Sequence, residues 1–362
     1  MLTTELGLAG AERVVVNLVH CLRAMGVECA VAALKEGRAG RGKTRALLED
    51  TGVDIFCAGV RRPWHLGGML SLRRFAVRWR PDVLHCHLIH GHMAGTLLRL
   101  GRLKVPTIWT HHSIIDPPGL GRRLFYRLFS GWADGHVFVS EAVRAYQLGI
   151  AGARAEEWVV HNGSDLDPLL GLRPRRGTVF GAVGRLVAGH KGFDVLVRAF
   201  ARVAALNDAA RLVIAGEGPD REMLRELIRD EGVADRVDLA GFVDDVAGFL
   251  SRVNIFVNPS RWEAFGNTLV EGMAAGLPCI ASHVDGLREV GGDCVRWVQP
   301  GDVDDLVAAM TDALAADRPP EEAARQREHV TARFGREAMA ARYWQCYLCV
   351  LGAAEPSSST GC

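Results

Sequence analysis

Short apolar runs alternate with stretches of helical periodicity along almost the whole chain. A helical face is clearest over residues 11–25, where Val15, Leu18, Val19 and Leu22 recur at the spacing of one helix side. In the first half, apolar runs between turn-forming residues predict strands at 29–34, 83–87, 107–110 and 136–139. Strands that alternate with helices are typical of parallel α/β architecture.

A second α/β series begins near Thr178. Its predicted strands are at 179–183, 211–215, 237–240, 255–258 and 279–281, and each precedes a helical pattern. Residues 161–168, between the two series, are rich in turn formers. The predicted fold class is therefore α/β, with two Rossmann-like domains that face a central cleft and bind ligands at the carboxyl ends of their strands.

These boundaries divide the chain into four expected parts. They are an N-terminal Rossmann-like domain over 1–165, a C-terminal one over 166–335, a final helix over 336–352 and a disordered tail over 353–362.

The composition is that of an ordinary globular protein. The 362 residues are 49% hydrophobic and 23% charged, and no apolar run is long enough to predict a membrane helix. The first residues lack the basic and apolar segments of a secretory signal, so we expect a cytoplasmic protein. Cys346 and Cys349 form a CxxC, which a redox or metal site would use, but reduced, unpaired cysteines are the favoured interpretation.

The charge is unevenly distributed. Residues 1–160 carry a formal charge of +8, whereas the remainder carries −7. Much of the positive charge lies at 61–62, 73–80 and 122–127, interleaved with aromatic and leucine side chains. This pattern suits an anionic membrane surface such as the inner face of the cell membrane, although a solvated helix face has the same composition. Nucleic acid is not expected as a partner, because no nucleic-acid-binding motif accompanies the charge.

The strongest chemical signal is the segment 259–278, PSRWEAFGNTLVEGMAAGLP. It predicts a strand end, a loop that carries Glu263, and a helix that begins near Asn267 and carries Glu271. The N–H groups of such a helix start can hold a diphosphate, and the two carboxylates can accept hydrogen bonds from sugar hydroxyls. Alternatively, Thr268 and Glu271 form a capping box, and Glu263 is a solvated loop acid.

Further segments accompany this one in a fixed order. They are GAER at 10–13, VHNGSD at 160–165, VGRL at 183–186, KGFDVL at 191–196, LVIAGEGP at 212–219 and AGFV at 240–243. Together with the Glu-x7-Glu pattern of Glu263 and Glu271, they resemble the signature of retaining glycosyltransferases of the large family 4 type, which have the GT-B fold. The resemblance covers nearly the whole chain.

The resemblance implies a role for each segment. The C-terminal domain would bind a nucleoside-diphosphate sugar, the N-terminal domain would bind the acceptor, and the final helix would cross back to the N-terminal domain. The implied donor-binding residues are Gly10, Arg185, Lys191, Phe242, Ala264, Phe265, Gly266, Asn267, Thr268 and Glu271.

Within that set, the implied contacts differ. Glu263 and the main chain of 264–266 would hold the sugar hydroxyls, Glu271 the ribose, and the segment around Phe242 the base. Cations such as Arg185 and Lys191 would stabilise the charge that develops on the leaving diphosphate. The resemblance implies no metal or other cofactor, and favours front-face attack in which the leaving phosphate takes the acceptor proton.

The N-terminal half carries most of the histidines. His112 resembles the family position whose imidazole lies beside the transferred sugar, so we expect it to be catalytic together with Glu263. His87 is a weaker candidate on the acceptor side. The alternatives are structural histidines and a zinc site, since His85 and His87 share a strand face.

The sequence departs from the family pattern at its start. Only Met1–Thr4 precede the segment that leads into the glycine loop, so we expect either that a start codon further upstream was missed or that the first strand is largely missing. Such a loss would expose a sheet edge and weaken the anchor of Gly10. Ala9 and Ala264 also stand where glycine is common.

The expected reaction is transfer of a sugar from a nucleoside-diphosphate sugar to a hydroxyl acceptor, with a lipid-linked or cell-envelope saccharide as the acceptor. A sugar-nucleotide epimerase or hydrolase of the same fold is a second interpretation, and a non-catalytic sugar-nucleotide-binding or assembly protein a third. A nicotinamide dehydrogenase is disfavoured, because Gly216 and Gly218 lack the third glycine and the acidic ribose ligand of that fingerprint.

Overall fold

The structure is a computed structural model that describes residues 1–7, 10–36, 43–60, 65–114, 119–152, 156–173, 176–317 and 319–353. Contacts within the chain divide it into two units. Unit 1 comprises Met1–Ser164 and Arg336–Cys362, and unit 2 comprises Asp165–Gly335. The expected disordered tail lies outside the described residues from position 354 onward.

Unit 1 contains a seven-stranded, wholly parallel sheet in the order β3-β2-β1-β4-β5-β6-β7. Its strands are β1 (Leu2–Glu5), β2 (Ala30–Lys35), β3 (Asp54–Cys57), β4 (Leu84–His87), β5 (Thr107–His111), β6 (Gly135–Phe138) and β7 (Glu156–Val159). Its helices are α1 (Gly10–Ala24), α2 (Lys43–Glu49), α3 (Leu66–Trp79), α4 (Leu88–Leu100), α5 (Leu120–Phe129), α6 (Glu141–Ala151) and α16 (Arg336–Val350).

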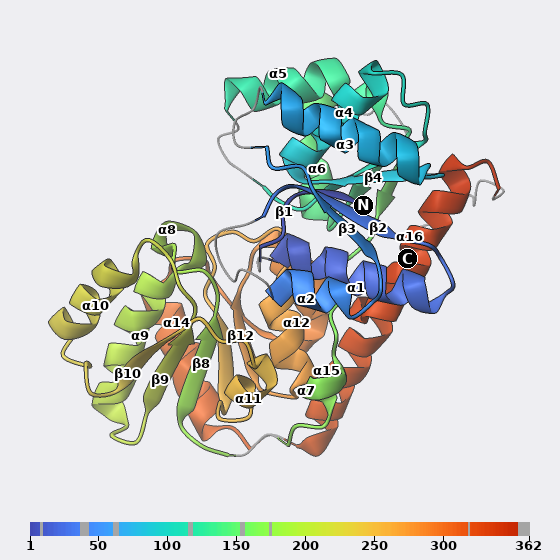
Figure 1. Cartoon of the computed structure of the whole chain (residues 1–362). Coiled ribbons are helices and arrows are strands. Elements are labelled where there is room, and N and C mark those ends of the chain that lie inside the picture. Colours follow the sequence, from blue (N-terminus) through green and yellow to red (C-terminus); the bar gives the residue numbers. More distant parts are fainter. Residues whose placement is uncertain are drawn as a thin grey trace. The chain divides into compact units, whose positions relative to one another are not determined.

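Helices cover both faces of this sheet, as the apolar strands of a parallel sheet require. Helices α3, α4, α5 and α6 pack on one face, over a core that includes Leu72, Ala94 and Tyr126 (Figure 1). Helices α1, α2 and α16 cover the other face. The last helix, α16, packs along α1 and buries Tyr343 and Tyr347, so the end of the described chain is part of the same unit as its beginning.

Unit 2 contains a six-stranded parallel sheet in the order β10-β9-β8-β11-β12-β13. Its strands are β8 (Val179–Val183), β9 (Arg211–Ala215), β10 (Val237–Gly241), β11 (Ile255–Asn258), β12 (Cys279–Ser282) and β13 (Arg296–Val298). Its helices are α7 (Asp167–Leu170), α8 (Ala188–Lys191), α9 (Phe193–Leu206), α10 (Arg221–Asp230), α11 (Val246–Leu250), α12 (Asn267–Ala274), α13 (Asp285–Gly291), α14 (Val303–Ala315) and α15 (Pro320–Phe334).

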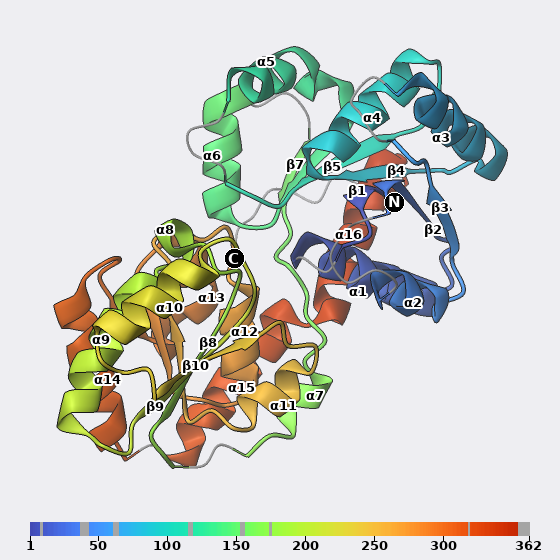
Figure 2. The ribbon, with the colours of Figure 1, turned by 60° about the vertical axis from the view of Figure 1, so that its left-hand side comes forward.

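The helices of unit 2 again form two layers. Helices α9, α10 and α14 pack on one face of the sheet, over a core built from residues such as Phe180, Phe200 and Ile214. Helices α12 and α15 pack against each other on the other face, with α7 beside α12 (Figure 2). The two sheets confirm the predicted class of two parallel, Rossmann-like α/β domains.

The expectation that the first strand is largely missing was wrong. Residues Leu2–Glu5 form β1, which lies in the middle of the sheet and pairs with β2 and β4. Leu2 and Thr3 are buried between the helix layers, which stabilises a strand too short and too polar to be recognised from its pattern.

Candidate active site

In unit 2, the order of the strands creates a switch point between β8 and β11. The chain proceeds outward from β8 to β9 and β10, then returns to β11 on the other side of β8. The crevice beside such a point, at the carboxyl ends of the strands, is the usual ligand site of a doubly wound sheet. Arg185 follows β8, Phe242 follows β10 and Glu263 follows β11, so the topology places all three at this edge.

The loop after β11 has the form that the sequence predicted. Glu263 lies in the loop, and α12 begins at Asn267. The N-cap of α12 is Gly266, with φ 108°, which has no side chain with which to cap the helix. Thr268 lies inside the helix, so the capping-box alternative was wrong. Glu271 follows in the second turn and is half-buried.

Lys191 and Glu263 form an ion pair at this edge. Lys191 Nζ donates to Glu263 Oε2 at 2.5 Å, and the side chains are 18% and 12% exposed. The same oxygen accepts a bond of 3.3 Å from Ser260 Oγ. The pair therefore places one cation and one carboxylate, 72 positions apart in the sequence, beside the start of α12.

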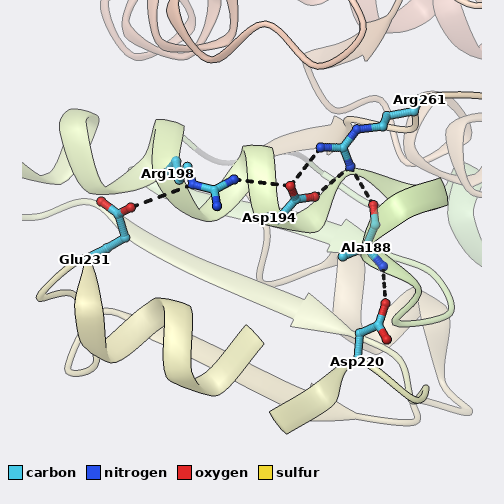
Figure 3. A network of polar contacts seen from close by, with 6 residues as sticks. All are labelled: Ala188, Asp194, Arg198, Asp220, Glu231 and Arg261. Carbon is cyan, nitrogen blue, oxygen red and sulfur yellow. Dashed lines mark hydrogen bonds and ion pairs between the residues drawn. The ribbon is translucent and has the colours of Figure 1, made fainter. Parts of the chain in front are cut away.

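A second ion pair holds the backbone of the same two loops together. Arg261 reaches Asp194, in the first turn of α9, through two bonds of 2.7 Å, and it also donates to the carbonyl oxygen of Ala188 at 2.6 Å (Figure 3). Burial alone would raise the pKa of Asp194, but the hydrogen bonds and charge of Arg261 outweigh it and lower that pKa. Arg198 joins Asp194 to Glu231 on the outer side of the pair. Arg261 thus ties the loop that carries Glu263 to the helix that ends in Lys191.

Two glycines permit the close approach of these loops. Gly192 has φ 66°, and a Cβ there would overlap the carbonyl oxygen of Pro259. Gly286, in α13, lies under the loop so closely that a Cβ would overlap the carbonyl oxygen of Glu263. Any larger residue at either position would push the loop away from its neighbours.

The other predicted donor-binding residues differ in how far their side chains are exposed to solvent. Phe242 is 48% exposed, an unusual state for a large aromatic side chain, and Arg185 is exposed too. Phe265, in contrast, is buried and meets Phe334 edge to face with ring centroids 5.5 Å apart. Only the main chain of Phe265 can therefore take part in binding. Ala264, beside it, is half-buried.

In unit 1, His87 and His112 come together at the carboxyl ends of β4 and β5. His87 Nδ1 and His112 Nε2 share a hydrogen bond of 2.9 Å. Burial lowers the pKa of His112 to about 4 and holds that of His87 well below the ordinary range, so both rings are neutral at pH 7. The remaining nitrogens, His87 Nε2 and His112 Nδ1, are buried without a hydrogen-bond partner among the described residues. In either tautomer, one of them is an unpaired donor and the other an unpaired acceptor.

The backbone next to His87 is strained. Leu88, at the start of α4, has a backbone φ of 63°, in the left-handed region that residues other than glycine rarely adopt. Such strain tends to cluster at functional sites. Gly10 begins α1 and is exposed, while the neighbouring residues 8 and 9 lie outside the described part of the chain.

The other histidines serve the core of unit 1. His85 bonds to Tyr347 at 2.7 Å and to Thr110 at 2.6 Å. His92 bonds to Tyr126, and His111 to His136. Within the described residues, no three His, Cys, Asp or Glu side chains are arranged to hold a metal ion.

The CxxC belongs to α16. Cys346 is buried, and burial raises the pKa of its thiol to about 12, which leaves it protonated and unreactive. No disulfide links it to Cys349.

Comparison with known proteins agrees with this architecture. A profile described as Glycosyltransferase Family 4 matches residues 8–168, and one described as Glycosyl transferases group 1 matches residues 177–316. A phosphatidyl-myo-inositol mannosyltransferase of Mycobacterium leprae is 30% identical over 324 residues, which cover 80% of this chain and 83% of the relative. The chain belongs to glycosyltransferase family 4.

Other relatives of this glycosyltransferase extend the comparison. The lipopolysaccharide core biosynthesis glycosyltransferase LpsE of Rhizobium meliloti is 28% identical over 360 residues, which cover 93% of this chain and 95% of the relative. The structure of Anabaena HepE in complex with UDP and glucose matches with a TM-score of 0.80 at 17% identity, over 95% of this chain and 98% of that one. Sucrose-phosphate synthase from Thermosynechococcus elongatus matches with a TM-score of 0.78 at 22% identity, over 98% and 99%. These structures show that the fold is GT-B.

Two residues of the candidate site were not identified from the sequence. Asp194 and Arg261 lie in segments that carried a family signal, but nothing in the sequence links two positions separated by 67 residues. The only available hint was an acidic residue in the first turn of a helix, which is commonly explained by the helix dipole alone.

Proposed function

We propose that this family 4 glycosyltransferase moves a sugar, with retention of anomeric configuration, from a nucleoside-diphosphate sugar to a hydroxyl group of a saccharide acceptor. The observation that carries the proposal is the strand-end edge of unit 2, where the Lys191–Glu263 pair lies beside the start of α12. A diphosphate needs fixed positive charge, and a sugar needs hydrogen-bond acceptors. This edge offers both.

Each donor group has a candidate partner in unit 2. The diphosphate would lie at the start of α12, with Lys191 and the exposed Arg185 opposing its charge. Glu263 would exchange its bond to Lys191 for sugar hydroxyls, and the half-buried Glu271 would accept from the ribose. The nucleobase would stack on Phe242, because the exposed ring of this residue offers an apolar surface that a base can cover.

In unit 1, the pair of His87 and His112 supports a role in sugar recognition. A sugar hydroxyl both donates and accepts, which matches the one unpaired donor and one unpaired acceptor of the pair. Since both rings are neutral, they would orient the sugar and stabilise partial charge rather than act as cations. We assign His112 to a sugar hydroxyl and His87 to the acceptor side.

Exposed apolar side chains on the outer helices of unit 1 support the proposal that the acceptor is bound to a membrane. Nine of the fifteen large apolar side chains exposed in the described residues lie on α3, α4 and α5. They are Leu66, Leu70, Val77, Met93, Leu97, Leu100, Leu120, Leu124 and Leu128. We refer to these nine residues, with the arginines of the same helices, as the α3–α5 face.

The chemistry of the α3–α5 face matches an anionic bilayer. Its three helices carry arginine but no aspartate or glutamate. Leu120, Leu124 and Leu128 recur every four residues, so they form one stripe along α5 beside Arg123 and Arg127. Leucines that enter the interface and arginines that meet lipid phosphates are the two requirements of interfacial binding. The basic cluster at 61–62 lies outside the described residues, and no helix in the described part is long and apolar enough to span a bilayer.

A transfer assay tests the catalytic proposal. The protein is incubated with UDP- and GDP-sugars and an acceptor panel, and the product anomer is assigned by NMR coupling constants. A product with the donor's configuration is expected. Inversion would contradict the proposal, release or isomerisation of the sugar without any acceptor would favour the epimerase or hydrolase, and donor binding without turnover would favour the non-catalytic protein.

Vesicle sedimentation tests the membrane proposal. Wild type should sediment with anionic vesicles but not with neutral ones, and the double variant Arg74→Glu, Arg78→Glu should lose this binding. A matched variant, Arg225→Glu, Arg229→Glu on α10 of unit 2, should behave as wild type. An equal loss of vesicle binding in both variants, or no loss of vesicle binding in either, would contradict a specific role for the α3–α5 face.

A further inference from the structure

His190, in the last turn of α8, lies against the indole of Trp262, in the loop that carries Glu263. The two ring planes are 17° apart and their centroids are separated by 3.5 Å, so the rings stack face to face. The main chains of the same two segments are also joined, because the N–H of Arg261 donates to the carbonyl oxygen of His190 at 2.9 Å. His190 is therefore fixed between the two segments that supply the Lys191–Glu263 pair.

The charges around His190 oppose each other. Burial lowers the pKa of its imidazole most, and Lys191 lowers this pKa further, whereas Glu263 and the main chain of Trp262 raise it. The ring is therefore mostly neutral at pH 7 in the free protein. Other charged groups of the elements packed here bond to one another or to the main chain, and they are Arg261, Asp194, Arg198 and Asp220 (Figure 3).

Donor binding would change this balance of charge. A diphosphate that pairs with Lys191 offsets the charge that opposes protonation of His190, and it takes from Glu263 the cation that this carboxylate, 12% exposed, has in the free protein. The face of an indole attracts a cation, so Trp262 stabilises a protonated ring in the position that the stack fixes. His190 Nε2 is buried without a hydrogen-bond partner in the part of the chain that the structure describes, so no bond at this atom fixes the neutral form.

We propose that His190 is a proton-linked positioning residue of the donor site: as a nucleoside diphosphate pairs with Lys191, the imidazole takes up a proton from the solvent and replaces Lys191 as the cation beside Glu263. This role rests on the donor site proposed above. The stack on Trp262 holds the second cation in place. A group that is more protonated in the complex than in the free protein favours the complex at low pH, so donor binding becomes stronger as the pH falls towards 6.

Titration calorimetry with UDP-glucose, GDP-mannose and ADP-glucose tests this role, because the phosphates of these donors do not titrate between pH 6 and pH 7.5. At pH 6 the wild type should take up protons on binding, so its binding enthalpy should depend on the ionisation enthalpy of the buffer. Its affinity should be about three- to tenfold higher at pH 6 than at pH 7.5, since each unit by which binding raises the pKa of His190 contributes up to about tenfold.

Two variants separate the proton from the stack. His190→Phe keeps a ring that can stack on Trp262 but cannot be protonated, so it should lose both the proton uptake and the rise in affinity. His329→Gln removes a half-buried histidine of α15, in the same unit, whose ring bonds to the carbonyl oxygen of Val290, and it should keep both effects. If His190→Phe does not fold, His190→Gln takes its place.

A second measurement needs no donor. Lys191→Ala removes the positive charge that a diphosphate would offset, so the midpoint of the NMR titration of His190 should rise by about one pH unit in this variant. An unchanged midpoint, or equal proton uptake in wild type and His190→Phe, would overturn the role of His190 and leave the donor site standing. Binding of none of the three donors to the folded protein would contradict the donor site itself, and the role of His190 with it.

Discussion

Neutralising Asp194 tests whether the loop that carries Glu263 and the segment that carries Lys191 depend on each other. Asp194→Asn keeps the size of the side chain but removes the charge that faces Arg261. The pair is partly buried, with Asp194 15% and Arg261 32% exposed, and it is bidentate at 2.7 Å. A hydrogen bond to a charged group contributes about 1.5–3 kcal/mol. Because water reaches Arg261 and can replace part of the bonding, we expect a loss of about 2 kcal/mol in the free energy of unfolding.

A matched control exists in the same unit. Arg202 and Asp304 also form an arginine–aspartate pair, at 2.5 Å, but its side chains are 53% and 84% exposed. Exposed pairs contribute at most about 1 kcal/mol, so Asp304→Asn should change little. For a unit of this size, a loss of 1 kcal/mol in the free energy of unfolding lowers the midpoint of thermal unfolding by about 2–4 °C. Scanning calorimetry should therefore show the unfolding midpoint of Asp194→Asn about 4–8 °C below that of wild type.

The donor affinity gives the second readout. Because Arg261 ties the Glu263 loop to the helix that ends in Lys191, Asp194→Asn should also weaken binding of the sugar nucleotide, whereas Asp304→Asn should not. Equal shifts in the two variants, or a large loss of stability with unchanged donor affinity, would refute the coupling of the two loops.

Three further perturbations address other parts of the site. Gly192→Ala should lower the free energy of unfolding by at least about 1–2 kcal/mol because of its left-handed backbone, and by more because of the overlap with Pro259. Gly189→Ala, in α8, meets open space, so it should not lower the free energy of unfolding measured in urea. Phe242→Ala should lower the affinity for nucleoside diphosphate in titration calorimetry by about 1–3 kcal/mol, the value of a stacked base, without loss of stability. The unfolded state binds protons at His112 below pH 6.5, whereas the folded state does so only near pH 4. Stability should therefore fall as the pH is lowered from 7 to 5.5, by about 1 kcal/mol for this residue, and His112→Asn should flatten the profile.

The sequence predicted central strands better than edge strands. The bounds of β8, β9 and β11 agree with the predicted runs, because these strands are buried on both faces and read as continuous apolar segments. The strands that were not predicted, β3, β7 and β13, all lie at sheet edges, where half-exposed and charged residues break the pattern. The strand β1 was misjudged because its stability comes from its neighbours rather than from its own four residues.

The candidate site residues show a similar contrast between what the local sequence pattern predicts and what depends on neighbouring strands. Local pattern was sufficient to place Glu263 in a loop and Asn267 at a helix start, since turn formers and helical periodicity mark that boundary. It did not reveal that Lys191 pairs with Glu263, or that His87 pairs with His112. Such contacts depend on which strand ends become neighbours in the sheet, and a single sequence does not encode that order locally.

Thermal unfolding with a panel of nucleoside diphosphates and sugar nucleotides tests the central claim most directly. A ligand at 100 times its dissociation constant stabilises the state that binds it by about 2.7 kcal/mol, a shift that calorimetry resolves easily. We predict a shift with the nucleotides of one base, lost in Lys191→Ala and Glu271→Ala but kept in Glu222→Ala on the exposed side of α10. No shift with any nucleotide, from a protein that unfolds cooperatively, would contradict a donor site at the strand ends of unit 2.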